Sequence, residues 1–257
     1  MNKVKKALLE RKVTFGSWIQ TESADSAEIM ADSDFEWIAI DCEHTSITIA
    51  DASSIIRAME LYGTIPFVRV EKNEALAIRK MLDAGARGII IPLVNNAEDA
   101  KNAVSYCKYP PCGVRGFAFC RANQYGRNFD KYVKDANSDI SVLVMIETKE
   151  AVKNIDSILG VDGVDGIFIG PYDLSGSYGV PGDLEHSDVQ AGIKKVIAAC
   201  KKKKKTAGIH IVKPEEKKVK ELVKMGYTFV ALGMDTIFLR DGMSFACKGL
   251  VKNKKRN

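Results

Sequence analysis

Polar residues of the types used in acid–base and metal chemistry follow several apolar runs of this sequence. The first group is Asp41-Cys42-Glu43-His44, in which a carboxylate lies three residues before a histidine. A carboxylate can orient an imidazole ring and raise its basicity, which predicts a general base that titrates near neutral pH. The alternative is structural: the histidine caps the loop, and the aspartate accepts hydrogen bonds from backbone amides.

An arginine, Arg69, lies inside the apolar run Ile65–Val70. A buried guanidinium needs an anionic partner, because an unpaired charge in an apolar interior is costly. Asp83, late in the following helical pattern, is a candidate for that partner; the alternative is that it is simply a surface acid. The alternative for Arg69 itself is a purely structural salt bridge.

Two further carboxylates, Glu147 and Asp173, follow neighbouring apolar runs. Oxygen ligands of this kind suit a hard divalent ion such as Mg²⁺ or Mn²⁺, with water and substrate filling the other positions. The alternatives are an acid–base pair, or a turn-capping role for Asp173. The turn 170–175 has backbone amides that could hold a substrate carboxylate. Lysines follow the apolar runs only at Lys149 and Lys213, which weakens a Schiff-base mechanism and favours a metal-assisted one.

The elements that must position these residues alternate between strand and helix. Nearly continuous apolar runs predict buried strands at Val13–Gln20, Trp37–Asp41, Ile65–Val70, Gly88–Leu93, Ser141–Glu147, Gly166–Gly170, Ala207–Val212 and Thr228–Gly233. Segments of helical period between them predict helices at Ser23–Ala31, Ala52–Leu61, Glu74–Ala84, Glu98–Lys108, Lys149–Leu159, Ser187–Lys203, Pro214–Met225 and Thr236–Lys248.

About eight such alternations in a chain of this length are typical of a (β/α)8 TIM barrel, in which catalytic groups lie at the C-terminal ends of the strands. We therefore expect residues 1–257 to form one barrel domain with the candidate residues around one mouth. A doubly wound open sheet is the alternative. One long irregular stretch, Tyr109–Ser138, interrupts the alternation, and a connection of that length is more often functional than not.

The composition is that of an ordinary globular protein, with 46% hydrophobic and 28% charged residues, which excludes disorder, collagen and coiled coil as overall descriptions. The net charge of +5 is unevenly placed: ten positive charges lie in Lys201–Lys205 and in the basic tail 248–257, a candidate for disorder. We interpret the lysine run as a solvated helix end, because no aromatic interleaving accompanies it, and we expect no nucleic-acid partner.

We also expect no membrane partner, because no run of about 18 apolar residues is present. The first residues lack the apolar core of a signal peptide. The six cysteines show neither a CxxC pair nor zinc-type spacing, which favours reduced thiols and a cytoplasmic location.

Taken in order, these phrases resemble the HpcH/HpaI aldolase family, the metal-dependent class II pyruvate aldolases of the 2-dehydro-3-deoxyglucarate and 4-hydroxy-2-oxoheptanedioate aldolase type. The resemblance covers residues 15–239 in one consistent order. The matching phrases are Gly16-Ser17-Trp18, Asp41-Cys42-Glu43-His44, Pro66-Phe67-Val68-Arg69-Val70, Leu82-Asp83-Ala84-Gly85-Ala86-Arg87-Gly88, Gly113-Val114-Arg115-Gly116, Arg121-Ala122, Ile146-Glu147-Thr148, Ile169-Gly170-Pro171-Tyr172-Asp173-Leu174-Ser175 and Phe229-Val230-Ala231-Leu232-Gly233. The family implies a barrel whose last helix is swapped between partners in a trimer or hexamer.

The resemblance also implies the metal and substrate ligands. Glu147 and Asp173 would bind Mg²⁺ or Mn²⁺, with Co²⁺ or Zn²⁺ as alternatives, and this ion would chelate pyruvate. Arg69 would face the keto oxygen and stabilise the enolate. Backbone amides around Gly170, Tyr172 and Asp173 would hold the pyruvate carboxylate.

The remaining roles that the resemblance implies concern proton transfer and the pocket wall. His44, oriented by Asp41, would act as the acid/base. Asp83 would brace this network, and Trp18 would line the pocket. The implied activity is the reversible cleavage of a 4-hydroxy-2-oxo acid to pyruvate and an aldehyde. The alternatives are a citrate-synthase-like enzyme of the same family and, from a different class, an anion- or nucleic-acid-binding protein that uses the Lys-rich patches.

Some residues depart from the family pattern and bear on the substrate more than on the reaction. Met145 stands where many relatives carry glutamine, Cys42 replaces a glycine, and Tyr172 replaces a small residue. His210, near the end of the seventh apolar run, could meet an acidic acceptor, although we favour a hydrogen-bonded core histidine.

Overall fold

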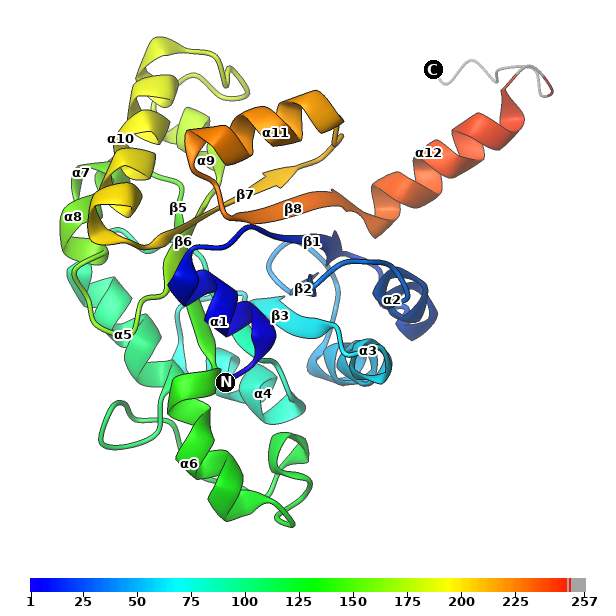
Figure 1. The fold of residues 1–257 in the computed structure, drawn as a ribbon, viewed down its shortest axis with the longest axis vertical. Coiled ribbons are helices and arrows are strands. Elements are labelled where there is room, and N and C mark those ends of the chain that lie inside the picture. The colour runs from blue at the N-terminus through cyan, green and yellow to red at the C-terminus, as the bar shows by residue number, and fades with distance from the viewer. Residues whose placement is uncertain (249, 251–257) are drawn as a thin grey trace.

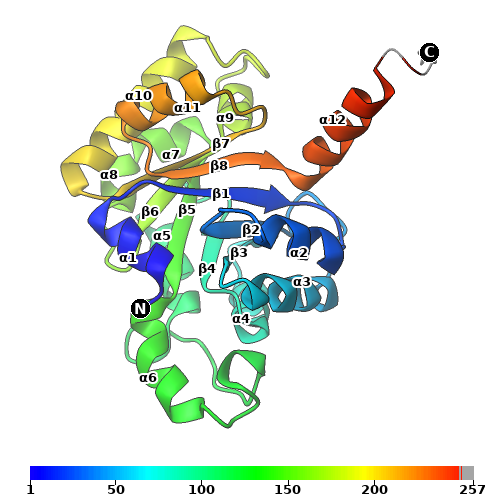
Figure 2. The same cartoon turned by 45° about the vertical axis from the view of Figure 1, so that its right-hand side comes forward.

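Eight parallel strands form a closed barrel in this computed structural model, which describes residues 1–248 and 250. Each strand pairs with the next in the chain, and β8 closes the barrel by pairing with β1 (Figures 1 and 2). The strands are β1 (Thr14–Ile19), β2 (Trp37–Asp41), β3 (Ile65–Arg69), β4 (Gly88–Ile91), β5 (Ser141–Ile146), β6 (Gly166–Ile169), β7 (Thr206–Ile211) and β8 (Phe229–Met234). The predicted (β/α)8 barrel is confirmed, and the open-sheet alternative is wrong.

Each predicted helix is present, and all of them except the last cover the outside of the barrel. These are α2 (Ala24–Ala31), α3 (Ile49–Leu61), α4 (Ala75–Ala84), α5 (Ala97–Cys107), α7 (Lys149–Lys153) with α8 (Ile155–Ile158), α10 (Ser187–Lys203), α11 (Glu216–Met225) and α12 (Asp235–Cys247). Four further elements lie outside the predicted helices, namely α1 (Lys3–Glu10), the 3-10 turn η1 (Arg121–Asn123), α6 (Phe129–Asp139) and α9 (Pro171–Ser177). The stretch expected to be irregular, 109–138, therefore contains η1 and most of α6.

The interior of the barrel is filled by aromatic side chains. Trp37 and Phe229 stack with ring centres 3.7 Å apart, and Phe67 packs against both. Gly16 makes room for this stack, since a Cβ there would lie 2.2 Å from the Trp37 ring. A second, larger apolar layer lies between the strands and the surrounding helices.

The N-terminal end of the barrel is closed by α1, whose Val4 and Leu8 join the same aromatic cluster. The helix is fixed there by Lys5, whose Nζ donates to Asp165 Oδ2 at 2.5 Å and to the carbonyl of Ile140 at 3.1 Å. Both groups of this ion pair are buried. The opposite, C-terminal end of the barrel is therefore the one left open for a site.

The last helix, α12, projects away from the barrel instead of covering it (Figures 1 and 2). It leaves large apolar side chains exposed: Phe238, Leu239, Met243 and Phe245. The predicted basic tail, 248–257, lies outside the described residues except at positions 248 and 250. Among the described residues, no helix is long and apolar enough to cross a membrane.

Candidate active site

A cavity of about 130 Å³ opens at the C-terminal end of the barrel. Residues at or near the ends of seven strands, all except β4, line it together with the start of α9. The lining residues are Trp18, Gln20, Asp41, Arg69, Met145, Phe168, Ile169, Gly170, Pro171, Tyr172, Asp173, His210, Val212 and Met234. Residues far apart in the sequence thus meet here, as the barrel geometry predicts.

The centre of the site is a two-pronged contact between neighbouring strands β2 and β3. Arg69 donates from Nε to Asp41 Oδ1 at 3.0 Å and from Nη2 to Asp41 Oδ2 at 2.8 Å. Its Nη1 lies 3.2 Å from Glu43 Oε2, and its guanidinium carbon lies 4.9 Å from the centre of the Trp18 ring. Burial by itself would raise the pKa of Asp41, but the hydrogen bonds and charge of Arg69, with a hydrogen bond from Gln20, lower it below its ordinary value. The guanidinium is therefore held in one orientation.

The expectation that Asp41 orients the His44 ring is wrong in this structure. Both carboxylate oxygens of Asp41 are taken by Arg69, and Oδ1 also accepts from the backbone amides of Glu43 and His44. The alternative in which the aspartate satisfies backbone amides is thus partly met. The His44 ring faces Glu43 instead, with 3.5 Å between Nε2 and Oε2, and its side chain is 60% exposed.

Asp83 is not part of this site within the chain. Since α4 leads from the C-terminal end of β3 back to the start of β4, a residue in its last turn lies at the opposite end of the barrel. Asp83 accepts from Arg115 Nη2 at 2.8 Å, and the same nitrogen donates to Tyr132 Oη at 3.1 Å. The expectation that Asp83 pairs with Arg69 of the same chain is therefore wrong, and the bracing role that the family resemblance implies for Asp83 stays a prediction.

Glu147 is a buried carboxylate at the end of β5, and only 4% of the residue is exposed. Its Oε1 accepts from the backbone amide of Leu93 at 2.7 Å. Burial raises its pKa to about 7 against that hydrogen bond, and the negative charges of Glu43 and Asp173 raise it further. Gly170 leaves room for this carboxylate, because a Cβ at position 170 would lie only 3.0 Å from Glu147 Oε2.

Asp173 lies in the first turn of α9 and is exposed at the rim of the same cavity. Its charge acts on both Glu43 and Glu147, so the three carboxylates share one region of space. Glu43 Oε2 is buried and has no hydrogen bond beyond its ion pairs. Crowded carboxylates of this kind are relieved by a bound cation.

The carboxylates of this region have the chemistry that a divalent metal needs. No group of three or more His, Cys, Asp or Glu side chains able to hold a metal occurs within residues 1–248 and 250. Glu147 and Asp173 could supply two oxygen ligands, a number that suits Mg²⁺ or Mn²⁺ because these ions keep several waters and bind substrate directly. The oxygen donors and the raised pKa of the buried Glu147 therefore fit a hard divalent ion.

His210 at the end of β7 lines the cavity, a position for which the sequence analysis favoured a core histidine. Its Nε2 lies 2.9 Å from the carbonyl of Gly233, which can only accept, so Nε2 carries the proton. Burial lowers its pKa to about 4, and the charge of Arg69 contributes, despite the opposing hydrogen bond to Gly233. The ring is thus both hydrogen-bonded, as expected, and a neutral part of the pocket wall.

Gln20 and Phe168 were missed because their types carry no chemical signal in the sequence. Gln20 donates from Nε2 to Asp41 Oδ2 at 3.1 Å, while Phe168 packs edge-on against Trp18 at 5.6 Å between ring centres. Their positions at strand ends are the only feature that marks them. Of the two departures from the family pattern that line the cavity, Met145 is buried and Tyr172 is 60% exposed.

A (β/α)8 barrel with a clamped arginine and a pair of carboxylates at its mouth defines a class of carbon–carbon lyases. The comparisons with known proteins agree: the sequence profile of the HpcH/HpaI aldolase/citrate lyase family matches residues 14–241, and the chain belongs to this family. It is therefore an enzyme of the aldolase/lyase class.

Named relatives and solved structures resemble nearly the whole chain. The chain is 40% identical over 240 residues to a 4-hydroxy-2-oxo-heptane-1,7-dioate aldolase of Shigella sonnei, and the aligned part covers 93% of this chain and 90% of that protein. An HpcH/HpaI aldolase/citrate lyase family protein from Burkholderia cenocepacia superposes with a TM-score of 0.92 at 30% identity, covering 96% and 98% of the two chains. The citrate synthase SbnG superposes with a TM-score of 0.84 at 29% identity, covering 95% of each chain.

Proposed function

We propose that this enzyme reversibly cleaves a 4-hydroxy-2-oxo acid to pyruvate and an aldehyde. The observation that carries the proposal is the Arg69 guanidinium, which Asp41 fixes in a cavity that Asp173 also lines. The carboxylate of Glu147 lies directly behind Gly170, a residue of the cavity wall. The named relatives support a substrate of the 4-hydroxy-2-oxo-heptane-1,7-dioate type. The cavity of about 130 Å³ suits a fragment of the size of pyruvate, with the remainder of the substrate toward the exposed rim.

Substrate orientation follows from the charges around the cavity. Glu147 and Asp173 would hold a divalent ion, Mg²⁺ or Mn²⁺, or alternatively Co²⁺ or Zn²⁺. A bound ion supplies positive charge where the enolate oxygen develops. Arg69 adds a second positive charge that needs no reorganisation, because Asp41 and Glu43 already fix its orientation. Amides of the turn around Gly170 and Tyr172 would hold the pyruvate carboxylate.

Proton transfer falls to His44, which is exposed beside Glu43 and lies outside the lining of the cavity itself. In the cleavage direction the 4-hydroxyl loses its proton to His44, the bond between C3 and C4 breaks, and the electron pair passes to the keto group as the enolate. Protonation of C3 then yields pyruvate, and the aldehyde leaves from C4. Trp18 forms the wall against which the reacting carbons would lie.

The test is pyruvate release from 4-hydroxy-2-oxoheptanedioate, followed with lactate dehydrogenase and NADH. We expect release that is abolished by EDTA and restored by adding back Mg²⁺, Mn²⁺, Co²⁺ or Zn²⁺ in turn. Release that persists in EDTA, or none with any metal, would contradict the proposal. A His44→Ala variant should lose turnover while retaining pyruvate binding.

The likeness to SbnG favours one second candidate, a carbon–carbon bond-forming reaction of the citrate-synthase kind. The same clamped arginine would then stabilise the enolate of an acetyl donor. Incubation with oxaloacetate and acetyl-CoA, followed by a thiol assay for free CoA, separates the two reactions. CoA release without aldol cleavage would favour this second function.

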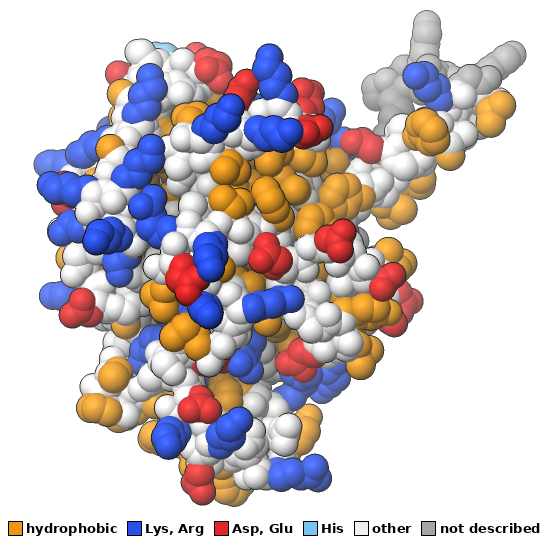
Figure 3. Space-filling model, in the orientation of Figure 1, with side chains coloured by type: hydrophobic (Ala, Val, Ile, Leu, Met, Phe, Trp, Pro, Cys, Tyr) orange, Lys and Arg blue, Asp and Glu red, His pale blue; other side chains and the backbone are white. Residues whose placement is uncertain are grey.

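We further propose that the chain is a homo-oligomer, a trimer or hexamer in which α12 packs against a partner subunit. The helix exposes Phe238, Leu239, Met243 and Phe245, of which Phe245 is 81% exposed. Apolar side chains also gather on the barrel surface between α11 and α2, beside the base of this helix (Figure 3). Light scattering after gel filtration should give a multiple of the 28.2 kDa chain mass, and Phe245→Asp should lower it.

A further inference from the structure

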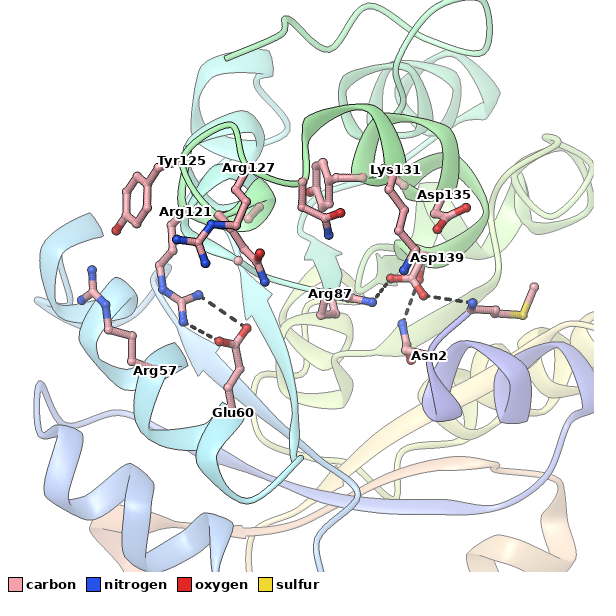
Figure 4. A pocket seen from close by; sticks show the side chains of 17 residues that line it. Asn2, Arg57, Glu60, Arg87, Arg121, Tyr125, Arg127, Lys131, Asp135 and Asp139 are labelled. Atoms are coloured by element: carbon pink, nitrogen blue, oxygen red, sulfur yellow. Dashed lines mark hydrogen bonds and ion pairs between the residues drawn. The ribbon is translucent and has the colours of Figure 1, made fainter. Parts of the chain in front are cut away.

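A second and much larger cavity, of about 720 Å³, lies at the N-terminal end of the barrel. Arg87, which lines it, directly precedes β4, and Asp139 ends α6 just before β5, so both mark the end opposite the candidate active site. Its walls come from α3, η1 and α6 (Figure 4). A volume of this size is within the range of small-molecule sites, roughly 300–1,000 Å³. The keto-acid chemistry at the other end of the barrel makes no use of it.

Positive charge exceeds negative charge among its lining side chains. The cations are Arg57, Arg87, Arg121, Arg127 and Lys131. The acids are Glu60, Asp135 and Asp139. Three ion pairs occur here: Arg121 with Glu60, Arg87 with Asp139, and the amino group of Met1 with Asp139 at 3.5 Å. Counting side chains alone, the cations of the cavity exceed its acids by two.

Three of the cations are unpaired. In the part of the chain that the structure describes, Arg57, Arg127 and Lys131 make no side-chain hydrogen bond and no ion pair. Arg127 and Lys131 extend from the segment above the cavity toward these ion pairs (Figure 4). These three side chains are exposed and free to turn toward an anion, and their mutual repulsion favours one.

Two other arginines are held in place and give the cavity fixed donors. Arg121 donates from Nη1 to the carbonyl of Ala84 at 2.9 Å, and its guanidinium lies against Gly85, where a Cβ would come within 2.3 Å of Nη1. Arg87 keeps a buried Nε that has no hydrogen-bond partner among the described residues. An unsatisfied buried N–H is unfavourable, and an anionic oxygen would satisfy it.

We propose that this basic cavity, defined by Arg57, Arg87, Arg121, Arg127 and Lys131, binds a small organic phosphate ester. The excess of two positive charges matches a phosphate dianion, and arginine forks suit phosphate oxygens in pairs. The volume exceeds the needs of an inorganic ion and accommodates the organic part of the ester. Because the two cavities lie at opposite ends of the barrel, binding does not compete with the keto acid and does not depend on the proposed function.

Isothermal titration of the full-length protein in EDTA tests the proposal, with ribose 5-phosphate, adenosine 5′-monophosphate and inorganic pyrophosphate as probes and ribose as the uncharged control. We expect the phosphate esters to bind, pyrophosphate to compete, and ribose not to bind. Arg57→Gln with Arg127→Gln should weaken binding at least about tenfold, since two charge-assisted contacts are lost. Both side chains are exposed and unpaired, so thermal unfolding of this double variant should match that of the wild type.

The matched control is Lys202→Gln with Lys203→Gln, which removes the same charge from the exposed end of α10. It should leave the affinity within about twofold, because a specific cavity and not general positive charge is responsible. Equal weakening by the two double variants would overturn the proposal, as would failure of all three phosphate probes to bind. Dissociation of the oligomer by Arg57→Gln with Arg127→Gln, without any phosphate binding by the wild type, would identify this face as a subunit contact and also overturn it.

Discussion

Replacing Glu147 by glutamine should stabilise the metal-free protein at alkaline pH, although it removes a proposed metal ligand. Burial raises the pKa of Glu147 from its ordinary value of 4.5 to about 7. The folded protein therefore binds this proton more tightly than the unfolded chain, and the stability of the metal-free protein falls as pH rises from about 4.5 to about 7. Above that range the full penalty, about 3 kcal/mol, is present.

The measurement is urea unfolding in EDTA, followed by tryptophan fluorescence at about pH 5 and about pH 8. At about pH 8 we expect Glu147→Gln to be more stable than the wild type by up to about 3 kcal/mol, because the amide carries no charge and its oxygen can still accept from Leu93. At about pH 5 the difference should be small. Adding Mn²⁺ should reverse the order, because the wild type alone gains binding energy.

Glu150→Gln provides the matched control, because it makes the same chemical change at an exposed position. Glu150 is the second residue of α7. It should alter stability equally at both pH values. If Glu147→Gln proved less stable than the wild type at about pH 8 in EDTA, the claim that burial penalises this carboxylate would be refuted.

Three further substitutions test the geometry of the site. Asp41→Asn should destabilise the protein by about 3 kcal/mol in urea unfolding and remove most activity, because it removes the charged, two-pronged partner of the Arg69 guanidinium and leaves only the contact with Glu43; an unchanged unfolding midpoint would contradict this. Gly170→Ala should weaken Mn²⁺ binding in a calorimetric titration, since the new methyl lies 3.0 Å from Glu147 Oε2, whereas Gly176→Ala, with nothing within 4 Å, should not. His210→Gln should preserve the shape of the pH–rate profile above about pH 5, because a group with a pKa of about 4 is already neutral there; loss of an acid limb in that range would show that His210 titrates during turnover.

The barrel could be predicted closely because buried parallel strands are continuous apolar runs. The strand Trp37–Asp41 begins and ends at the expected residues, and the other strands differ at their ends by one or two residues. The helices α1 and α6 were missed because their sequences are rich in charged residues and the second follows a loop with prolines and glycines. Local pattern is a weak guide where docking onto the barrel stabilises the helix.

The location of the candidate site could be predicted from the sequence, but the hydrogen-bond and ion-pair partners of its side chains could not. Position at a strand end placed Asp41, Arg69 and Glu147 at one mouth. The choice of partner depends on side-chain reach across strands, which spacing does not encode: Asp41 binds Arg69 of the next strand and not the His44 ring three residues away. Asp83 was placed at the mouth by the family resemblance, whereas the last turn of α4 lies at the opposite end of the barrel in this chain. The cytoplasmic location and the absence of a nucleic-acid partner stay predictions.

The buried pair of Lys5 and Asp165 has a consequence for the order in which the chain matures on the ribosome. The two residues are 160 positions apart, so the first helix is made long before the strand region that fixes it. At synthesis rates of roughly 5–20 residues per second, α1 waits on the order of 10–30 s with its apolar face unpartnered. The N-terminal end of the barrel is therefore closed late, by the part of the nascent chain that was made first.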